Sequence, residues 1–270
     1  MLSALRARTG KGKVMILEEF DENKEAVINP SDINERVGEM PRILVGCYSR
    51  ATFDRMVGEL CVRKISETSC ANGVTPIYKT NLRGTDIALT MVDVGAPMSA
   101  AMLEDVYEQG VQTAIIFGTC GVLDSKIDDC SVIIPTSAVR DEGTSYHYAP
   151  PSDEIGVNEE YADVLCALLD RLKVKYTVGK VWTTDAFYRE TAEKTKRRKE
   201  SGCICVDMEC SANSAVAKFR GKGLCQFFYA ADNLDSEEWD ARSLANDMRL
   251  EEKDRIAATA LELAVLIDKM

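Results

Sequence analysis

A carboxylate at the start of a helix is the first candidate for chemistry in this sequence. Glu209 follows the short apolar run Ile204-Cys205-Val206 and precedes the small residues 211–217, which are typical of a helix. Unpaired backbone N–H groups at a helix start favour negative charge, so we expect Glu209 to be ionised and to point into a pocket. Such a carboxylate can accept hydrogen bonds from two neighbouring hydroxyl groups, as a ribose offers. Taken alone, the stretch favours an ordinary helix with an acidic first turn.

Two segments that contain glycine could hold an anion. Gly46 follows an apolar run and stands four residues before Arg50, whereas Gly118 follows a second apolar run and precedes Thr119. A glycine lets backbone N–H groups approach an anion closely, and an arginine or a hydroxyl group can complete the contact. We expect the chain to turn at Gly118, at the end of a strand. Taken alone, each segment favours a plain turn without a ligand.

Aromatic and acidic residues at two further strand ends could bind a planar ring. Phe187 and Tyr188 follow a polar sequence, and their adjacent rings could stack on a base. Asp232 ends the apolar run that contains Tyr229. Partial burial would raise the pKa of Asp232, which suits a general acid near neutral pH.

Apolar, strand-like runs alternate with helical patterns along the chain. The runs that predict strands are 43–46, 87–94, 113–117, 132–134, 176–182 and 224–229. Apolar spacing predicts helices over 98–109, 159–172 and roughly 247–268. We therefore predict an α/β protein: a single three-layer α/β/α domain over residues 40–270 with a central mixed, mostly parallel sheet. In such sheets ligands bind at the carboxyl ends of strands, where Gly46, Gly118 and Asp232 should lie.

Composition argues against several classes of function. The net charge is −11, from 44 acidic and 33 basic residues, which disfavours binding to nucleic acid. The single His147 and ten scattered cysteines form no metal-binding pattern, and free thiols suit a cytoplasmic protein. The apolar runs are far too short for a membrane span. Residues 1–40 are predicted to be an N-terminal extension, of which the basic stretch 1–13 should be flexible or contact a partner.

Several of these segments together resemble one enzyme family. The segments that carry the resemblance are Leu44–Arg50, Gly118–Gly121, Ser137–Pro150, Thr183–Tyr188, Val206–Glu209 and Tyr229–Asp232. In this order they are similar to nucleoside phosphorylases of the purine nucleoside phosphorylase and uridine phosphorylase type, over about residues 40–268. The resemblance implies cleavage of the N-glycosidic bond of a nucleoside with inorganic phosphate as co-substrate, for nucleotide salvage, without a metal or cofactor. It also implies a homo-oligomer, either a dimer or a hexamer, with sites at subunit interfaces.

The resemblance assigns a role to each motif residue. Gly46, Arg50 and Thr119 would contact phosphate, with Arg50 counted as catalytic. Met208 and Glu209 would hold the ribose, and Glu209 would take its 2′- and 3′-hydroxyl groups. Phe187 would stack on the base, and Asp232 would bind the base and protonate a purine at N7. Such a proton typically speeds departure of the leaving group by ~10²–10⁴-fold.

Departures from the family pattern leave alternatives open. Ile116 stands where the family usually carries a phosphate-binding arginine, and no residue in 69–73 matches the arginine that a neighbouring subunit donates. Lys79 or Arg140 could supply charge to a remodelled phosphate site. If water replaced phosphate, the protein would be a hydrolytic nucleosidase, with Glu142 and Asp185 as weak candidates for activating the water. The residues that grip uracil in uridine phosphorylases are replaced by Thr191 and Glu193, so purine is preferred over a uridine phosphorylase-like activity. A non-catalytic nucleoside-binding protein is the third reading.

Overall fold

The computed structural model describes residues 15–236, 238–244 and 248–270. Its centre is one large sheet with the strand order β10-β6-β8-β9-β5-β1-β4-β3-β2. The strands are β1 (Ile43–Cys47), β2 (Arg63–Cys70), β3 (Gly73–Leu82), β4 (Thr85–Met91), β5 (Thr113–Val122), β6 (Val132–Asp141), β7 (Glu154–Gly156), β8 (Tyr176–Thr184), β9 (Cys203–Asp207) and β10 (Gly223–Asn233). Strand β1 lies between β4 and β5 and is parallel to both. Strands β2 and β3 extend the sheet as antiparallel partners.

Part of the sheet closes on itself. Strand β10 is parallel to β5 and antiparallel to β6. Strand β8 lies between β6 and β9 and is parallel to both. Strand β9 in turn pairs antiparallel with β5. The five strands β5, β10, β6, β8 and β9 therefore form a ring. Closure of this kind leaves no unpaired strand edge and brings the last residues of β5, β9 and β10 together.

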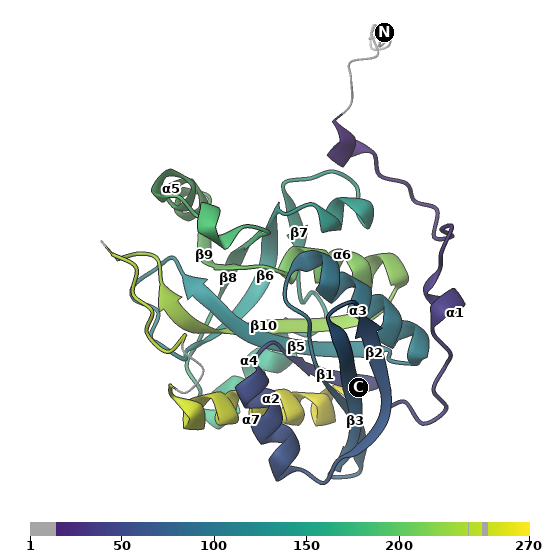
Figure 1. The fold of residues 1–270 in the computed structure, drawn as a ribbon. Coiled ribbons are helices and arrows are strands. Elements are labelled where there is room, and N and C mark those ends of the chain that lie inside the picture. Colours follow the sequence, from purple (N-terminus) through teal and green to yellow (C-terminus); the bar gives the residue numbers. More distant parts are fainter. Residues whose placement is uncertain (1–14, 237, 245–247) are drawn as a thin grey trace, which may run out of the picture.

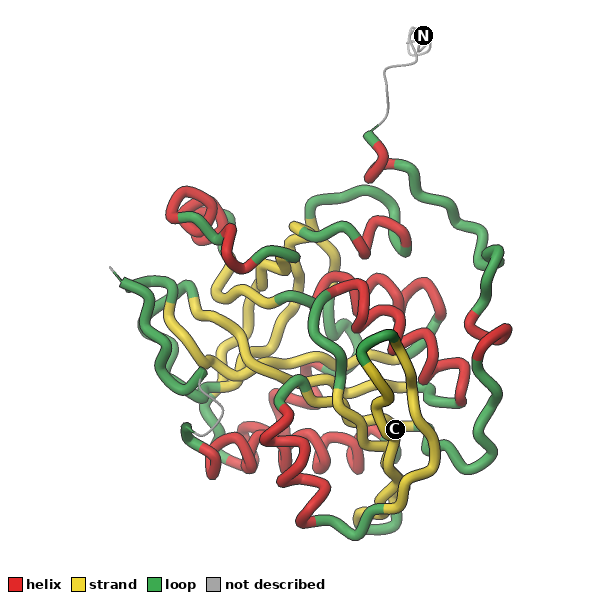
Figure 2. Tube along the Cα trace, viewed as in Figure 1, coloured by secondary structure: helices red, strands yellow, loops and turns green. Residues whose placement is uncertain are grey.

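Helices cover both faces of the sheet (Figure 1). On one face lie α2 (Arg50–Glu59), α4 (Ala162–Leu172) and α7 (Leu250–Ile267), and on the other lie α3 (Ala96–Gln109) and α6 (Cys210–Arg220). Buried side chains of α4 and α7 share one apolar cluster with β1 and β5, whereas those of α3 and α6 share a second. The predicted mixed α/β architecture is confirmed. Helix α5 (Ala192–Glu200) lies apart from both layers, beyond the end of the sheet (Figure 2).

Strands β5 and β10 are among those that run further than their apolar patterns predict. The prediction that the chain turns at Gly118 is wrong, because β5 continues through it to Val122. A Cβ atom at Gly118 would lie 2.7 Å from the Tyr48 ring, so the glycine allows a close side-chain approach within a strand. Strand β10 likewise continues past Tyr229 and includes Asp232. The polar residues of both strand ends are thereby held by sheet pairing.

The segment before β1 runs along the outside of the molecule (Figure 1). It contains the short helix α1 (Pro30–Ile33) and contacts the body through Phe20, whose ring meets that of Phe219 edge-on at 6.4 Å. Asn34 also donates a hydrogen bond to Asp105 at 2.7 Å. The predicted flexible arm, residues 1–13, lies outside the described residues, and the division at residue 40 stays a prediction.

None of the described helices combines the length and the apolar character that a membrane span requires. The described residues also hold no cluster of three or more His, Cys, Asp or Glu side chains with the spacing of a metal site. All ten cysteines lie in the described part of the chain and are unpaired.

Candidate active site

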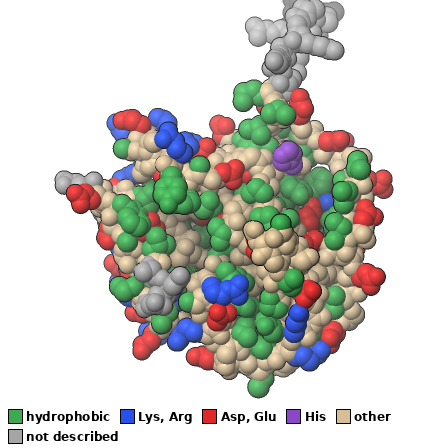
Figure 3. All heavy atoms as spheres, in the orientation of Figure 1, with side chains coloured by type: hydrophobic (Ala, Val, Ile, Leu, Met, Phe, Trp, Pro, Cys, Tyr) green, Lys and Arg blue, Asp and Glu red, His purple; other side chains and the backbone are tan. Residues whose placement is uncertain are grey.

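A cavity of about 1110 Å³ opens where β5, β9 and β10 end. Its walls are Thr119–Gly121 of β5, Val206–Glu209 at the end of β9, and Asp232 and Leu234 at the end of β10. The segment that follows β8 and helix α5 complete the rim. On the face shown in Figure 3, basic side chains gather on α5 and hydrophobic side chains lie next to them. The cavity brings together five of the predicted site residues: Thr119, Phe187, Met208, Glu209 and Asp232.

Glu209 lies in the wall of the cavity, where its surroundings disfavour the ionised form expected from its place at a helix start. Its side chain is only 5 % exposed, and burial together with the negative charge of Asp207 raises its pKa well above the usual range. The N–H groups at the start of α6 do not stabilise it, because Asp207 Oδ2 accepts hydrogen bonds from the backbone N–H groups of Glu209 and Cys210 at 2.8 and 2.6 Å. Glu209 Oε1 instead accepts the Gly95 N–H at 2.5 Å. The Asp207 side chain thus accepts the first N–H groups at the start of α6, and Glu209 is held in place by a distant loop.

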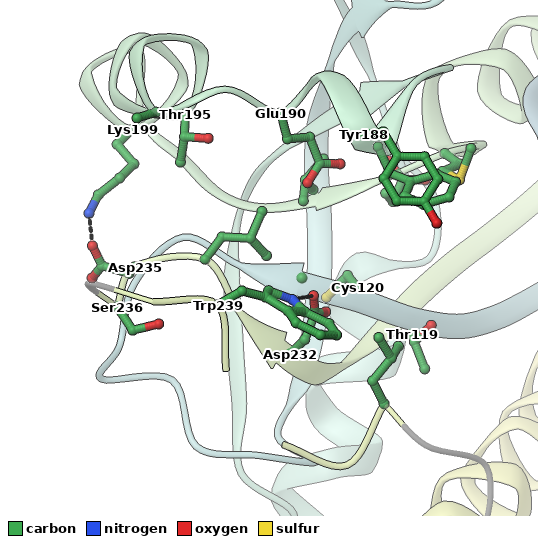
Figure 4. A pocket seen from close by; sticks show the side chains of 18 of the residues that line it. Thr119, Cys120, Tyr188, Glu190, Thr195, Lys199, Asp232, Asp235, Ser236 and Trp239 are labelled. Carbon is green, nitrogen blue, oxygen red and sulfur yellow. Dashed lines mark hydrogen bonds and ion pairs between the residues drawn. The ribbon is translucent and has the colours of Figure 1, made fainter. Parts of the chain in front are cut away.

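Aromatic and acidic side chains also line the cavity. Phe187 and Tyr188 are 51 % and 88 % exposed, and their ring centroids lie 4.1 Å apart. In Figure 4, Tyr188 and Glu190 come from one wall, and Asp232 and Trp239 come from the other. Burial raises the pKa of Asp232, as expected, although the Trp239 indole N–H opposes the shift by donating a hydrogen bond to its carboxylate. Burial and the charge of Asp232 raise the pKa of Glu190 to about 7.

The predicted phosphate residues do not all reach the cavity. Thr119 lines it beside Tyr48, whose hydroxyl group hydrogen-bonds to Ser99 and Asn213 at 2.9 Å each. Gly46 is buried in β1, where a Cβ atom would lie 2.5 Å from Val92, and it is not part of the lining. Arg50 begins α2 outside the lining, is exposed, and forms an ion pair with Asp54 at 3.7 Å.

The described cations of the lining come from helix α5. They are Lys196 and Lys199, and Lys199 pairs with Asp235 across the rim (Figure 4). Ile116, at the position of the missing arginine, is fully buried in the apolar cluster beneath α3 and α6.

Four other candidate residues do not line the cavity and instead form hydrogen bonds or ion pairs with the protein around it. Lys79 pairs with Asp86 at 2.6 Å on the β3–β4 hairpin. Arg140 is buried and binds its own loop, including Ser145 at 2.8 Å. Glu142 accepts hydrogen bonds from the Ser145 N–H and from the hydroxyl group of Ser211, each at 2.8 Å, and Asp185 accepts the Gly143 N–H at 3.0 Å. Their proposed parts in binding phosphate or activating water are therefore not supported by their positions.

The sequence profile of the phosphorylase superfamily matches residues 54–266. The chain belongs to this family. It is 28 % identical over 168 residues to a guanosine phosphorylase of Halorubrum lacusprofundi, an alignment that covers 61 % of this chain and 68 % of that protein. A DeoD-type purine nucleoside phosphorylase of Bacillus cereus is 24 % identical over 183 residues, covering 64 % and 76 %. A uridine phosphorylase of Thermococcus kodakarensis is 31 % identical over 114 residues, which cover 41 % of each chain.

Solved structures of family members share the fold. A uridine phosphorylase from Vibrio fischeri superposes with a TM-score of 0.74 at 23 % identity, covering 86 % of this chain and 95 % of that one. A purine nucleoside phosphorylase from Toxoplasma gondii, in complex with immucillin-H, gives a TM-score of 0.72 at 19 % identity, with 87 % and 95 % covered. At this level of identity the likeness shows the fold alone.

Within this family fold, several lining residues were not anticipated as site residues from the sequence. Among them are Tyr48, Glu190, Lys196 and Trp239. Glu190 follows Phe187 by three residues and could have been noticed as an acid beside a predicted base-binding ring. Trp239 and Tyr48 carry no local signal, because their positions depend on how β10 and β1 pair with β5.

Proposed function

We propose that the protein cleaves the N-glycosidic bond of a purine nucleoside with inorganic phosphate, giving the free base and ribose 1-phosphate. One observation carries the proposal: a single cavity gathers a hydroxyl group for phosphate, a carboxyl group for the ribose, and aromatic and acidic side chains for the base. We assign Thr119 to the phosphate, Glu209 to the ribose, and Phe187 and Asp232 to the base. Family membership supports the same reaction class.

The proposed reaction moves one proton and one electron pair at the base. A phosphate oxygen attacks C1′ while the bond from C1′ to the base nitrogen breaks, and its electrons pass to the purine ring. Asp232, whose protonated form burial favours, gives a proton to N7 and so neutralises the leaving base. Glu209 holds the 2′- and 3′-hydroxyl groups, and Met208 packs on the sugar. Solvent returns the proton to Asp232 after the base leaves.

Glu190 adds a second acidic group to the base end. A carboxyl group with a pKa of about 7 both donates and accepts hydrogen bonds near neutral pH. A purine presents donors and acceptors on its ring edge that such a group could bind. Thr191 and Glu193 stand where uridine phosphorylases carry the residues that bind uracil, and they lack that chemistry. This supports purine over pyrimidine nucleosides.

Hydrolysis by water is the second candidate, and a specific observation favours testing it. The Ile116 side chain lies in an apolar cluster, and the described lining near Thr119 carries no arginine. Two lost charge-assisted contacts would weaken phosphate binding by ~1.5–3 kcal/mol each.

A phosphorylase of this kind therefore needs positive charge from Arg50 or from a second subunit. We accordingly propose a homodimer or hexamer, acting in the cytoplasm and without a cofactor.

The deciding experiment measures product release from inosine, adenosine, guanosine and uridine, each with and without phosphate. Release of a purine base together with ribose 1-phosphate, only when phosphate is present, is the expected result. Equal release of free ribose without phosphate would make the protein a hydrolase. Binding of nucleosides without any product would favour the non-catalytic reading.

A further inference from the structure

Trp239 is folded back over Asp232 by a tight loop after β10. The backbone N–H and carbonyl groups of Asn233 and Asp240 pair in both directions, at 2.8 and 3.3 Å. Asp235, at the rim, accepts hydrogen bonds from the backbone N–H and the hydroxyl group of Ser125 at 3.0 and 3.1 Å. These bonds hold Asn233, Asp235 and Asp240 in place.

The same pairing decides which side chains face the cavity. In paired strands, alternate residues point to one side, and residues opposite each other share that side. Because Asn233 is opposite Asp240, the side chains of Asp232, Leu234 and Trp239 share the other side, and all three line the cavity. Trp239 is nevertheless 64 % exposed, so packing alone does not explain its position.

The hydrogen bond between Trp239 and Asp232 distinguishes the two carboxylate oxygens. The indole N–H donates to Asp232 Oδ2 at 2.9 Å, and an indole nitrogen can only donate (Figure 4). Oδ2 must therefore be an acceptor in this contact. A proton on the carboxyl group belongs on Oδ1, which lies 3.1 Å from where a Cβ atom would stand at Gly121, another lining residue.

We propose that Trp239 is a positioning residue that holds Oδ2 of Asp232, so that Oδ1 carries the proton and presents it to the base beside Gly121. This inference rests on the proposed function, in which Asp232 is the proton donor. Gly121 has a part in the arrangement, because any side chain there would collide with Leu234 and crowd Oδ1. The other charged groups that act on Asp232 are Arg242, whose guanidinium binds the Ile127 carbonyl, Asp240 on the same loop, and Glu190 across the cavity.

The first test is the pH dependence of kcat in Trp239→Phe, which keeps a ring but removes the N–H. We expect kcat to fall roughly tenfold, as for loss of one hydrogen bond to the reacting group. The indole bond lowers the pKa of Asp232, so its removal raises that pKa. The loss of activity at high pH, where Asp232 gives up its proton, should therefore move to higher pH. An equal fall in kcat at every pH, without movement of this limb, would overturn the proposal.

The second test needs no activity and uses the fluorescence of tryptophan. The chain has two tryptophans, and the other, Trp182, also donates its indole N–H to a carboxylate, Asp141, at 2.9 Å. In Trp182→Phe the emission comes from Trp239 alone. It should change as pH crosses the pKa of Asp232, and Asp232→Asn should abolish the change. If Trp182→Phe does not fold, subtracting the Trp239→Phe signal from that of the unsubstituted protein gives the same titration.

The two tests separate this inference from the proposed function. If Asp232→Asn abolishes turnover but the Trp239 emission titrates identically with and without Asp232, Trp239 does not position the acid and the function stands. The other outcome is that Asp232→Asn keeps full activity, while the Trp239 emission of the protein with Asp232 still changes as Asp232 ionises. The contact is then real, but Asp232 is not the proton donor, and the positioning role of Trp239 fails with that assignment.

Discussion

Replacing Glu209 by glutamine tests the ribose contact most directly. The carboxyl group is buried, and its Oε1 accepts the Gly95 N–H at 2.5 Å. Glutamine has the same shape and keeps an acceptor for that N–H, so the loop between β4 and α3 should stay in place. Alanine would leave the N–H unpaired, at a cost of about 1–3 kcal/mol of stability. Glu209→Gln therefore tests the ribose contact while it keeps the loop in place. Glu209→Ala is the comparison that shows the stability lost when the Gly95 N–H has no acceptor.

The size of the effect follows from the hydrogen bonds involved. A hydroxyl group that donates to an ionised carboxylate contributes about 1.5–3 kcal/mol, and the amide of glutamine loses this charge-assisted contact. We expect kcat/KM for a ribonucleoside to fall roughly 10- to 150-fold. The 2′-deoxyribonucleoside already lacks one hydroxyl group, so its kcat/KM should fall far less. In the variant, the ratio of kcat/KM for the ribonucleoside to kcat/KM for the 2′-deoxyribonucleoside should consequently shrink to about threefold or less, as expected for coupled groups.

The pH dependence provides a second measure of the same residue. Burial raises the pKa of Glu209 above its usual value of 4.5, so the folded protein binds this proton more tightly than the unfolded chain does. The unsubstituted protein should therefore lose stability relative to Glu209→Gln as pH rises from 4.5 through the raised pKa. Ribose hydroxyl groups favour the ionised form, so KM for the nucleoside should fall over the upper part of this range. Thermal unfolding and initial rates across pH measure both effects. An unchanged ratio of ribose to deoxyribose activity in Glu209→Gln would refute the ribose contact.

Four further predictions concern other parts of the site. Gly121→Ala places a methyl group 2.5 Å from a methyl group of Leu234 and 3.1 Å from Oδ1 of Asp232. Its kcat should fall roughly tenfold with KM for phosphate unchanged, which steady-state rates will show. Phe187→Ala should raise KM for the nucleoside about tenfold by loss of stacking, without lowering the melting temperature, because the ring is half exposed. Arg50→Ala should raise KM for phosphate more than tenfold if Arg50 supplies the missing charge. The control is Arg55→Ala, which removes an arginine from the same helix α2 together with its ion pair to Asp254 of α7; equal phosphate KM values in both variants would exclude Arg50. Glu190→Gln should become more stable relative to the unsubstituted protein as pH rises from 4.5 to about 7, because the raised pKa of Glu190 costs stability in that window; parallel melting curves across pH would contradict this.

The residues brought into the cavity were predictable where motif and strand end coincide. Thr119, Glu209 and Asp232 each follow an apolar run, and the carboxyl ends of neighbouring strands meet at one place. The residues that set their chemistry were not predictable in the same way. Asp207 accepts hydrogen bonds from the N–H groups at the start of α6, and burial raises the pKa of Glu209. Which of two acids separated by one residue caps a helix depends on backbone angles that the spacing of residue types does not specify.

The sequence by itself determined the alternation of strands and helices, the family, and the chemical types available to the site. Periodicity and composition record which faces are buried, and these are local properties of the chain. The tertiary structure alone decided that β10 closes a ring with β5, that β5 runs straight through Gly118 against Tyr48, and that Trp239 folds back onto Asp232. Arg50, assigned to the site by its motif, stands outside the cavity lining. Contacts of this kind join residues far apart in the chain or depend on the path of a loop. They follow from strand register and close packing, which no short motif encodes.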